Sequence, residues 1–337
     1  MITLDIKNLT VHYRTDQGVV EALDEASLSI QKGEIVGLVG ESGCGKSTMG
    51  RAILRILPES SGEVVSGGIY FQGKNLLELS MKEINSQVRG RAITIIPQDP
   101  FSSFNPTFPI GSQFMDILKH KLADRNRKNG KKSLLRRLFP SSSREVKRRV
   151  IEMLRSVQIP SSEKQIYKYP HEFSGGQRQR IMIAMALAPQ PSLIIADEPT
   201  TALDATIGAQ VLELLRDLAK QVFRTSVLFI THDLGVADEI CDRIAVMYAG
   251  QIMESAPTES FFRRPCHPYT RGLLASLPNP GGKIQTIPGE IPVLINPPTG
   301  CRFHPRCTRA VQECNKKRPE FLELFPEHWV RCFNPYL

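Results

Sequence analysis

Short apolar runs, each followed by a polar or glycine-rich segment, recur along the chain and predict strands that end in loops. These runs cover residues 35–39, 69–71, 92–96, 193–196 and 227–231. The run at 193–196 is apolar enough to be buried on both faces of a parallel sheet. A helix is expected to follow a serine cap at residue 174 and to include residues 178–188. The pattern predicts an α/β fold with polar groups at the strand ends.

The first of these loops has the spacing of a phosphate-binding loop, with Gly40, four further residues, and then Gly45, Lys46 and Ser47. Glycines let the backbone curl until its N–H groups face a phosphate, and the helix that begins near Lys46 favours negative charge there. Lys46 adds a positive charge, Ser47 can place its hydroxyl on a magnesium ion, and Thr48 can help to hold the loop. The ATP contacts predicted in this loop are Gly40, Ser42, Gly43, Cys44, Gly45, Lys46, Ser47 and Thr48.

Three more candidate catalytic positions follow later apolar runs. Asp197 and Glu198 end the run at 193–196, and we expect Asp197 to contact magnesium and Glu198 to orient or deprotonate the attacking water. Gln98 follows the run at 92–96, in a loop rich in proline and serine where a glutamine can move. His232 follows the run at 227–231. It is either a strand-end histidine or, as we favour, a group that polarises the terminal phosphate.

A second phosphate cradle is predicted at Ser174, Gly175, Gly176 and Gln177. A serine cap and two glycines at a helix N-terminus expose several N–H donors at the positive end of the helix dipole. A plain capped helix is the alternative. Because the phosphate loop already provides a cradle for the chain's own nucleotide, we expect the second cradle to serve the nucleotide of a partner subunit.

In this order the motifs make residues 1–255 resemble the nucleotide-binding subunit of an ABC transporter. The resemblance implies a P-loop NTPase core with an antiparallel β subdomain and a helical subdomain near residues 100–185. It implies that Gln98 reports on magnesium and the terminal phosphate, and that Asp204 lies in a loop that crosses the dimer interface towards the partner's ATP. It also implies that Tyr13 stacks on adenine through its ring face, although a half-buried strand tyrosine is the alternative.

Residues 256–337 narrow the resemblance to the C-terminal extension of oligopeptide and dipeptide importers. They contain His267-Pro268-Tyr269, a proline-rich stretch at 278–298 that predicts an extended connector, and four late cysteines. In a reducing cytosol such thiols bind metal more plausibly than they form disulfides, but their spacing is not that of the usual zinc ribbon. The spacing leaves an iron–sulfur cluster, zinc and unliganded thiols open. The resemblance favours a [4Fe–4S] cluster with the ligands Cys301, Cys307, Cys314 and Cys332.

Composition and charge exclude other classes of protein. Of the 337 residues, 41% are hydrophobic and 23% are charged, which excludes disorder throughout. No apolar run approaches the roughly 18 residues needed to cross a bilayer, and the N-terminus lacks the layout of a signal peptide, so we expect a cytoplasmic chain. The net charge of +9 is concentrated in a basic insertion at 119–149. This insertion reads as a solvated loop, with contact to anionic lipid headgroups as the alternative.

The sequence therefore predicts an ATPase subunit that powers import of dipeptides or oligopeptides, bound peripherally at the cytoplasmic face of the cell membrane. Its expected cofactors are ATP, Mg²⁺ and a [4Fe–4S] cluster. Its expected partners are a second ABC ATPase subunit, two membrane permeases and an external substrate-binding protein, with no direct contact to nucleic acid. A metal-chelate or antimicrobial-peptide cargo stays open. A soluble cassette ATPase acting on nucleic acid or ribosomes is the alternative from another class, supported only by the basic insertion.

Overall fold

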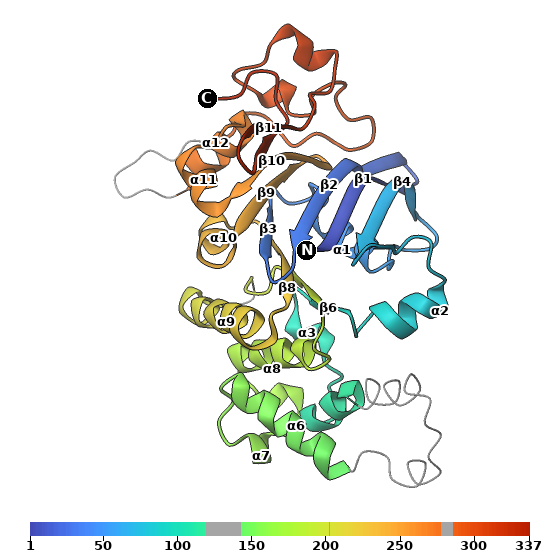
Figure 1. Ribbon diagram of the computed structural model, residues 1–337, viewed down its shortest axis with the longest axis vertical. Helices are drawn as coiled ribbons and strands as arrows, with labels where there is room; N and C mark the ends of the chain where they lie inside the picture. The colour runs from blue at the N-terminus through green and yellow to red at the C-terminus, as the bar shows by residue number, and fades with distance from the viewer. Residues whose placement is uncertain (119–142, 202, 278–285) are drawn as a thin grey trace. The chain divides into compact units, whose positions relative to one another are not determined.

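The computed structural model describes residues 1–118, 143–201, 203–277 and 286–337 (Figure 1). They form two compact units, one made of Met1–Leu79 with Ser226–Leu337 and the other of Ser80–Thr225. The basic insertion lies outside the described residues except for positions 143–149, and so do the first eight residues of the proline-rich stretch. The domain boundary expected near residue 255 lies within the first unit and stays a prediction.

An antiparallel sheet in the first unit has the strand order β2-β1-β4-β5. Its strands are β1 (Ile2–Thr15), β2 (Gly18–Gln31), β4 (Gly62–Phe71) and β5 (Lys74–Asn75). Along β1 the buried apolar positions change from even to odd, from Leu4 and Ile6 to Leu9 and Val11. A shift in register lies between Ile6 and Leu9, and Asn8 there has a φ of 45°. This bulge keeps the apolar side chains on one face along a long strand.

A second sheet in the first unit contains parallel strands that carry the phosphate loop. Its strands in this unit lie in the order β11-β12-β10-β9-β3-β8. Their bounds are β3 (Ile35–Val39), β8 (Ser226–Thr231), β9 (Arg243–Tyr248), β10 (Gln251–Pro257), β11 (Leu322–Phe325) and β12 (His328–Val330). Every residue of β3 and β8 is buried, as expected for strands covered on both faces. The C-terminal strand β12 pairs with β10, so the end of the chain is built into the same sheet.

Short helices accompany this sheet. They are α1 (Lys46–Ile53), α10 (Leu234–Ile240), α11 (Thr258–Arg263) and α12 (Pro268–Ala275), with 3₁₀ turns at His304–Arg306 and Gln312–Asn315. Helix α10 packs on β3 and β8, and α11 packs on β9 and β10.

The second unit combines two parallel strands with a group of helices, drawn in cyan to yellow in Figure 1. Strand β6 (Ile93–Ile96) pairs in parallel with β7 (Leu193–Asp197). The helices are α2 (Met81–Glu83), α3 (Pro100–Ser103), α6 (Ser143–Ser156), α7 (Ser162–Gln165), α8 (Gly175–Leu187) and α9 (Ala205–Asp217), with π-helical turns at Ile84–Val88 and Leu218–Phe223 and a 3₁₀ turn at Pro170–Glu172. Helix α8 is central, because it contacts α3, α6, α9 and β6.

The last turn of α8 is tied to a strand of the same unit by a buried hydrogen bond. The Thr94 hydroxyl donates to the Ala186 carbonyl over 2.9 Å.

Among the described residues, no helix has both the length and the apolar character needed to cross a membrane.

Candidate functional site

The phosphate loop connects β3 to α1 and requires glycine at two positions. A Cβ atom on Gly40 would lie 2.2 Å from the Met247 carbonyl oxygen, and one on Gly45 would lie 2.5 Å from the Ala22 carbonyl oxygen. Gly45 also has a φ of 111°, in the left-handed region that favours glycine. The glycines predicted from the motif are therefore needed for close backbone packing as well as for the turn.

Lys46 is buried at the start of α1 and points back over the loop. Its ammonium group donates to the carbonyl oxygens of Gly40 over 2.7 Å and Glu41 over 3.0 Å. Cys44 lies beneath it, and burial raises the pKa of this thiol, which therefore stays protonated at neutral pH. The loop thus holds one positive charge among backbone dipoles, which suits an anionic ligand.

His232 is brought close to the phosphate loop by the register of the parallel strands. Val39 at the end of β3 pairs with Thr231 at the end of β8. Gly40 and His232 therefore follow paired residues at the same edge of the sheet, although they are far apart in sequence. His232 is exposed, and Asp233 next to it caps α10 by accepting from the N–H groups of Gly235 and Val236. The role of His232 at the terminal phosphate stays a prediction.

In the second unit, strand pairing likewise brings the catalytic candidates together. Ile96 pairs with Ala196, so the loops with Gln98 and with Asp197 and Glu198 leave the same ends of β6 and β7. The Gln98 amide donates to Glu198 Oε2 over 3.1 Å, and the Thr201 hydroxyl donates to the same oxygen over 3.0 Å.

Glu198 has a φ of 47°, an unusual conformation for a residue other than glycine. Its carboxylate is fixed by two side chains, and its strained backbone is of the kind that clusters at functional sites.

The second predicted cradle opens α8 in the form of a capping box. The Ser174 hydroxyl accepts from the Gln177 N–H over 3.3 Å, and the Gln177 side-chain oxygen accepts from the Ser174 N–H over 3.1 Å. Gly175 and Gly176 form the first turn. A Cβ on Gly176 would lie 2.5 Å from Cγ2 of Ile207 in the neighbouring helix α9. Asp204 caps α9 by accepting from the Ile207 N–H over 3.2 Å. The N-termini of α8 and α9, which Ser174 and Asp204 cap, therefore lie side by side.

Tyr13 was interpreted either as the residue that stacks on adenine or as a half-buried strand tyrosine. It lies near the end of β1 with a half-buried side chain. Its phenol oxygen is buried and has no hydrogen-bond partner within the described part of the chain. The edge of its ring packs against Gly62, where an added Cβ would lie 3.0 Å from Cε1. The adenine-stacking role of Tyr13 stays a prediction.

The four C-terminal cysteines lie near one another. Cys301 and Cys314 are buried, and the Cys301 N–H donates to the Cys314 carbonyl over 2.8 Å. Burial raises the pKa of Cys332 to about 12, and its three cysteine neighbours add to the effect. Backbone N–H groups of Val311 and Asn334 point at Cys314 Sγ and Cys332 Sγ, each over 3.4 Å. No three of the four sulfurs, all of which the structure describes, lie within 4.8 Å of one another.

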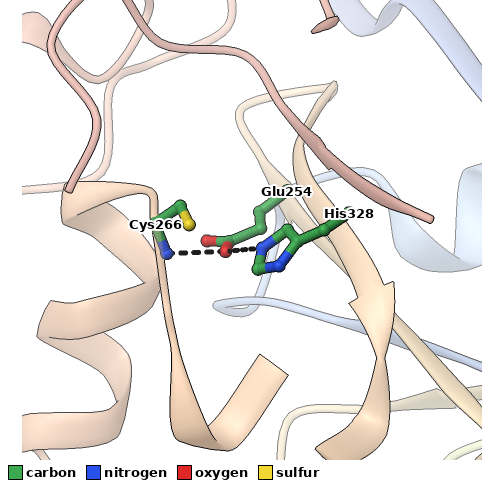
Figure 2. A group of neighbouring side chains, drawn as sticks. All are labelled: Glu254, Cys266 and His328. Atoms are coloured by element: carbon green, nitrogen blue, oxygen red, sulfur yellow. Dashed lines mark hydrogen bonds and ion pairs between the residues drawn. The ribbon is translucent and has the colours of Figure 1, made fainter. Parts of the chain in front are cut away.

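A buried carboxylate that the sequence analysis missed organises this end of the first unit (Figure 2). Glu254 is 0% exposed. Its Oε1 accepts from the Cys266 N–H over 2.7 Å and lies 2.6 Å from His328 Nε2, and its Oε2 accepts from the His267 N–H over 2.8 Å. Glu254, Cys266 and His328 have side chains of the kinds that bind zinc. Here hydrogen bonds already use both carboxylate oxygens. The available signal was a glutamate that directly follows the apolar pair Ile252 and Met253.

The His267-Pro268-Tyr269 motif proves to be a helix cap held by this carboxylate. His267 Nδ1 accepts from the Tyr269 N–H over 2.9 Å at the start of α12. Burial lowers the pKa of His267 to about 4, which keeps the ring neutral and able to accept. The motif is therefore a structural device that joins α12 to β10.

Sequence profiles of two families match the chain. The profile described as ABC transporter matches residues 23–201, and the profile described as oligopeptide/dipeptide transporter, C-terminal region, matches residues 253–314. This chain belongs to the ABC transporter ATP-binding proteins. Members of this family are ATPases, so the strand-end groups described above belong to an ATP-hydrolysing fold.

Relatives in this family match almost the whole chain. A probable peptide ABC transporter ATP-binding protein of Sinorhizobium fredii is 44% identical over 98% of this chain and 95% of the relative. The oligopeptide transport ATP-binding protein OppD of Bacillus subtilis is 44% identical over 97% of this chain and 87% of the relative. The dipeptide transport ATP-binding protein DppD of Bacillus subtilis is 41% identical over 98% of this chain and 94% of the relative. The resemblance drawn from the motifs is confirmed.

Solved structures confirm the α/β fold of an ABC ATPase. The dimeric ATP-binding cassette MJ0796 in a post-hydrolysis state bound to ADP and Pi has a TM-score of 0.61 and 27% identity, covering 76% of this chain and 98% of that one. The protein cbiO1 from Clostridium perfringens, part of the ABC transporter complex cbiONQ, has a TM-score of 0.60 and 25% identity, covering 78% of this chain and 91% of that one. The roles of individual residues stay predictions.

Proposed function

We propose that this chain is the ATP-hydrolysing subunit of an importer of dipeptides or oligopeptides. The observation that carries the proposal is the match of residues 253–314 to the C-terminal region of oligopeptide/dipeptide transporters. Relatives named for oligopeptide and dipeptide transport align over 97–98% of the chain. The matched region begins within β10, which pairs with β9 in the same sheet as the phosphate-loop strand β3, so it is an integral part of the subunit.

In this proposal, individual side chains and loop N–H groups each have a role in binding or hydrolysing ATP. Lys46 exchanges a backbone carbonyl for a phosphate oxygen, while loop N–H groups around Gly43 and Gly45 bind the phosphates. Magnesium, when bound by Ser47, Asp197 and Gln98, offsets the negative charge of the phosphates. Glu198 accepts the proton of the attacking water, and His232 donates to the terminal phosphate. Tyr13 stacks on the adenine.

Two nucleotides are enclosed between two cassettes in this proposal. Ser174, Gly175, Gly176, Gln177 and Asp204 serve the ATP of the partner subunit. The adjacent starts of α8 and α9 support this role, because both place N–H donors and positive dipole ends at one surface. MJ0796, whose structure is dimeric and contains ADP and Pi, gives the precedent for such pairing.

An iron–sulfur cluster held by the four C-terminal cysteines is part of this proposal. Cys301 and Cys314 are buried, and all three of the other cysteines lie near enough to Cys332 to raise its pKa. The N–H groups aimed at Cys314 and Cys332 are of the kind that tunes such clusters. When bound, the cluster supplies a redox-active cross-link between Cys301, Cys307, Cys314 and Cys332.

This cluster is tested by anaerobic purification of the full chain. Iron and acid-labile sulfide are expected in equal amounts, near four of each per chain. Replacing Cys314 by serine is expected to remove both. Zinc without sulfide in the wild-type protein would contradict the cluster.

The assembly contains a second ABC ATPase subunit, two membrane permeases and an external binding protein, with this chain at the cytoplasmic face of the membrane. Residues 1–255 form the nucleotide-binding domain and residues 256–337 the extension. Affinity purification of the tagged chain from detergent-solubilised membranes tests this assembly. A second cassette and two permeases are expected by mass spectrometry, whereas ribosomal proteins or nucleic acid without permeases would refute it.

A further inference from the structure

An arginine of the cysteine-containing segment holds an acidic side chain of the phosphate loop. Arg306 lies in the 3₁₀ turn between Cys301 and Cys307 and is only 7% exposed. Its guanidinium donates to both carboxylate oxygens of Glu41, over 2.8 Å and 3.2 Å. Glu41 directly follows Gly40, the first glycine of the phosphate loop. The two residues are 265 positions apart in sequence, and both belong to the first unit.

The guanidinium is itself fixed by other groups of the first unit. Its Nε donates to the Pro288 carbonyl over 2.9 Å, and its Nη1 donates to the Tyr248 hydroxyl over 3.4 Å. Its carbon lies 5.6 Å from the centre of the Tyr248 ring, which adds a cation–π contact. Because the planar guanidinium is itself held by several groups, it fixes the carboxylate in one orientation. A flexible lysine side chain would not do this.

A second C-terminal side chain holds the backbone of the same residue. The hydroxyl of Tyr269, at the start of α12, accepts from the Glu41 N–H over 3.2 Å. Tyr269 is fully buried and packs edge-on against Tyr248, with 4.7 Å between ring centres. Both the peptide and the side chain of Glu41 are thus bound by residues outside the motif that defines the phosphate loop.

The ion pair between Arg306 and Glu41 removes a negative charge from the phosphate loop. The Glu41 carbonyl accepts from Lys46, so the Glu41 carboxylate belongs to a residue that contacts the phosphate-binding ammonium group. An unpaired carboxylate here would repel the phosphates of ATP and compete for Lys46. The bidentate pair with Arg306 cancels this charge. Its screening by water is limited, because the arginine side chain is 6% exposed and the glutamate side chain 24% exposed.

We propose that Arg306 is a positioning residue of the nucleotide site, which neutralises Glu41 and fixes the phosphate loop so that ATP affinity depends on the contact between Arg306 and Glu41. Tyr269 supports the same loop through its backbone. The inference rests on the proposed function, because it takes the phosphate loop as the binding site for ATP. It makes a residue of the C-terminal extension a support of the ATP site.

The test is the affinity of the purified full chain for a fluorescent, slowly hydrolysed ATP analogue with Mg²⁺. We expect Arg306→Gln to weaken binding about tenfold, because an uncompensated carboxylate is left beside the phosphates. The double variant Glu41→Gln with Arg306→Gln is expected to return to within about threefold of wild type, since the repelling charge is gone. Tyr269→Phe, which removes only one hydroxyl from a packed ring, is expected to weaken binding about threefold with its fold intact.

Arg302→Gln is the matched control. Arg302 is a buried arginine of the same segment that pairs with Asp24 over 2.8 Å and also with Glu21, both on β2 and outside the phosphate loop. Its replacement is expected to lower the melting temperature as much as Arg306→Gln does while leaving analogue affinity within about twofold of wild type.

Three outcomes separate the possibilities. Equal affinities for wild type, Arg306→Gln and Tyr269→Phe would overturn the inference alone. Equal weakening by Arg302→Gln and Arg306→Gln, without recovery in the double variant, would also overturn it, because it would show a general structural effect. A wild-type chain that binds no nucleotide would overturn the proposed function together with the inference.

Discussion

Replacing Glu198 by glutamine should separate ATP binding from ATP hydrolysis. Glu198 Oε2 accepts hydrogen bonds from the Gln98 amide and the Thr201 hydroxyl. Glutamine has the same shape, and its carbonyl oxygen can accept both bonds, so the loop after β7 keeps its form. The amide cannot take the proton of the attacking water. The variant therefore loses the chemical step and keeps the site.

The magnitude follows from the role of a positioned general base. Such a group contributes about 10²- to 10⁴-fold to a rate, or roughly 3–5 kcal/mol of activation free energy. We expect kcat for ATP hydrolysis to fall by about this factor, with the affinity for ATP within about threefold of wild type. Phosphate release by the purified full chain and binding of a fluorescent ATP analogue measure the two quantities.

Glu163→Gln provides the control for the loss of one carboxylate. Glu163 lies on α7 of the same unit, is exposed, and pairs with Arg155. An exposed pair of this kind stabilises little, so hydrolysis by this variant should equal that of wild type. Hydrolysis by Glu198→Gln at the wild-type rate, or an equal loss of affinity and rate, would refute the role assigned to Glu198.

Three further predictions concern other parts of the chain. Glu254→Gln should lower the free energy of unfolding, measured by chemical denaturation, by about 3 kcal/mol, because the amide nitrogen would face an N–H donor inside a buried cluster. The control is Glu259→Gln on α11, an exposed position, which should change the free energy of unfolding by less than about 0.5 kcal/mol. The free energy of unfolding should fall by up to about 3 kcal/mol as pH drops from the unfolded-state pKa of histidine near 6.5 towards the folded pKa of His267 near 4. The cause is that the unfolded chain binds a proton that the buried ring does not. His267→Asn, which keeps an acceptor, should reduce this pH dependence, and an unchanged pH profile in this variant would contradict the prediction. Lys46→Ala should weaken ATP-analogue binding by at least about 30-fold without lowering the melting temperature by more than a few degrees, and binding at wild-type strength would contradict its role.

The motifs that could be read from the sequence depend on local backbone chemistry. Gly40, Gly45 and Lys46 define the phosphate loop because the turn, the close packing and the charge all lie within a few residues. Ser174 and Gln177 form their capping box within one helical turn. The runs at 35–39 and 193–196 were recognisable as strands because strands buried on both faces are continuously apolar.

Other features depend on contacts between distant residues, which no local pattern encodes. The pairing of Val39 with Thr231, which brings His232 to the phosphate loop, is a matter of strand order and register. The contact of Arg306 with Glu41 joins a C-terminal turn to a loop near the N-terminus. The burial of Glu254 follows from the addition of β12, a strand of three residues that is too short to show a period.

Peptide uptake by cells tests the central claim most directly. A strain that lacks this chain is supplied with the wild-type chain, Glu198→Gln or Glu163→Gln, and accumulation of a labelled dipeptide and a labelled oligopeptide is followed with and without cellular ATP. The account predicts ATP-dependent uptake of at least one peptide with the wild-type chain and Glu163→Gln, and none with Glu198→Gln. Peptide uptake that is equal in the strain lacking the chain and in the complemented strains, or that continues with Glu198→Gln, would contradict it.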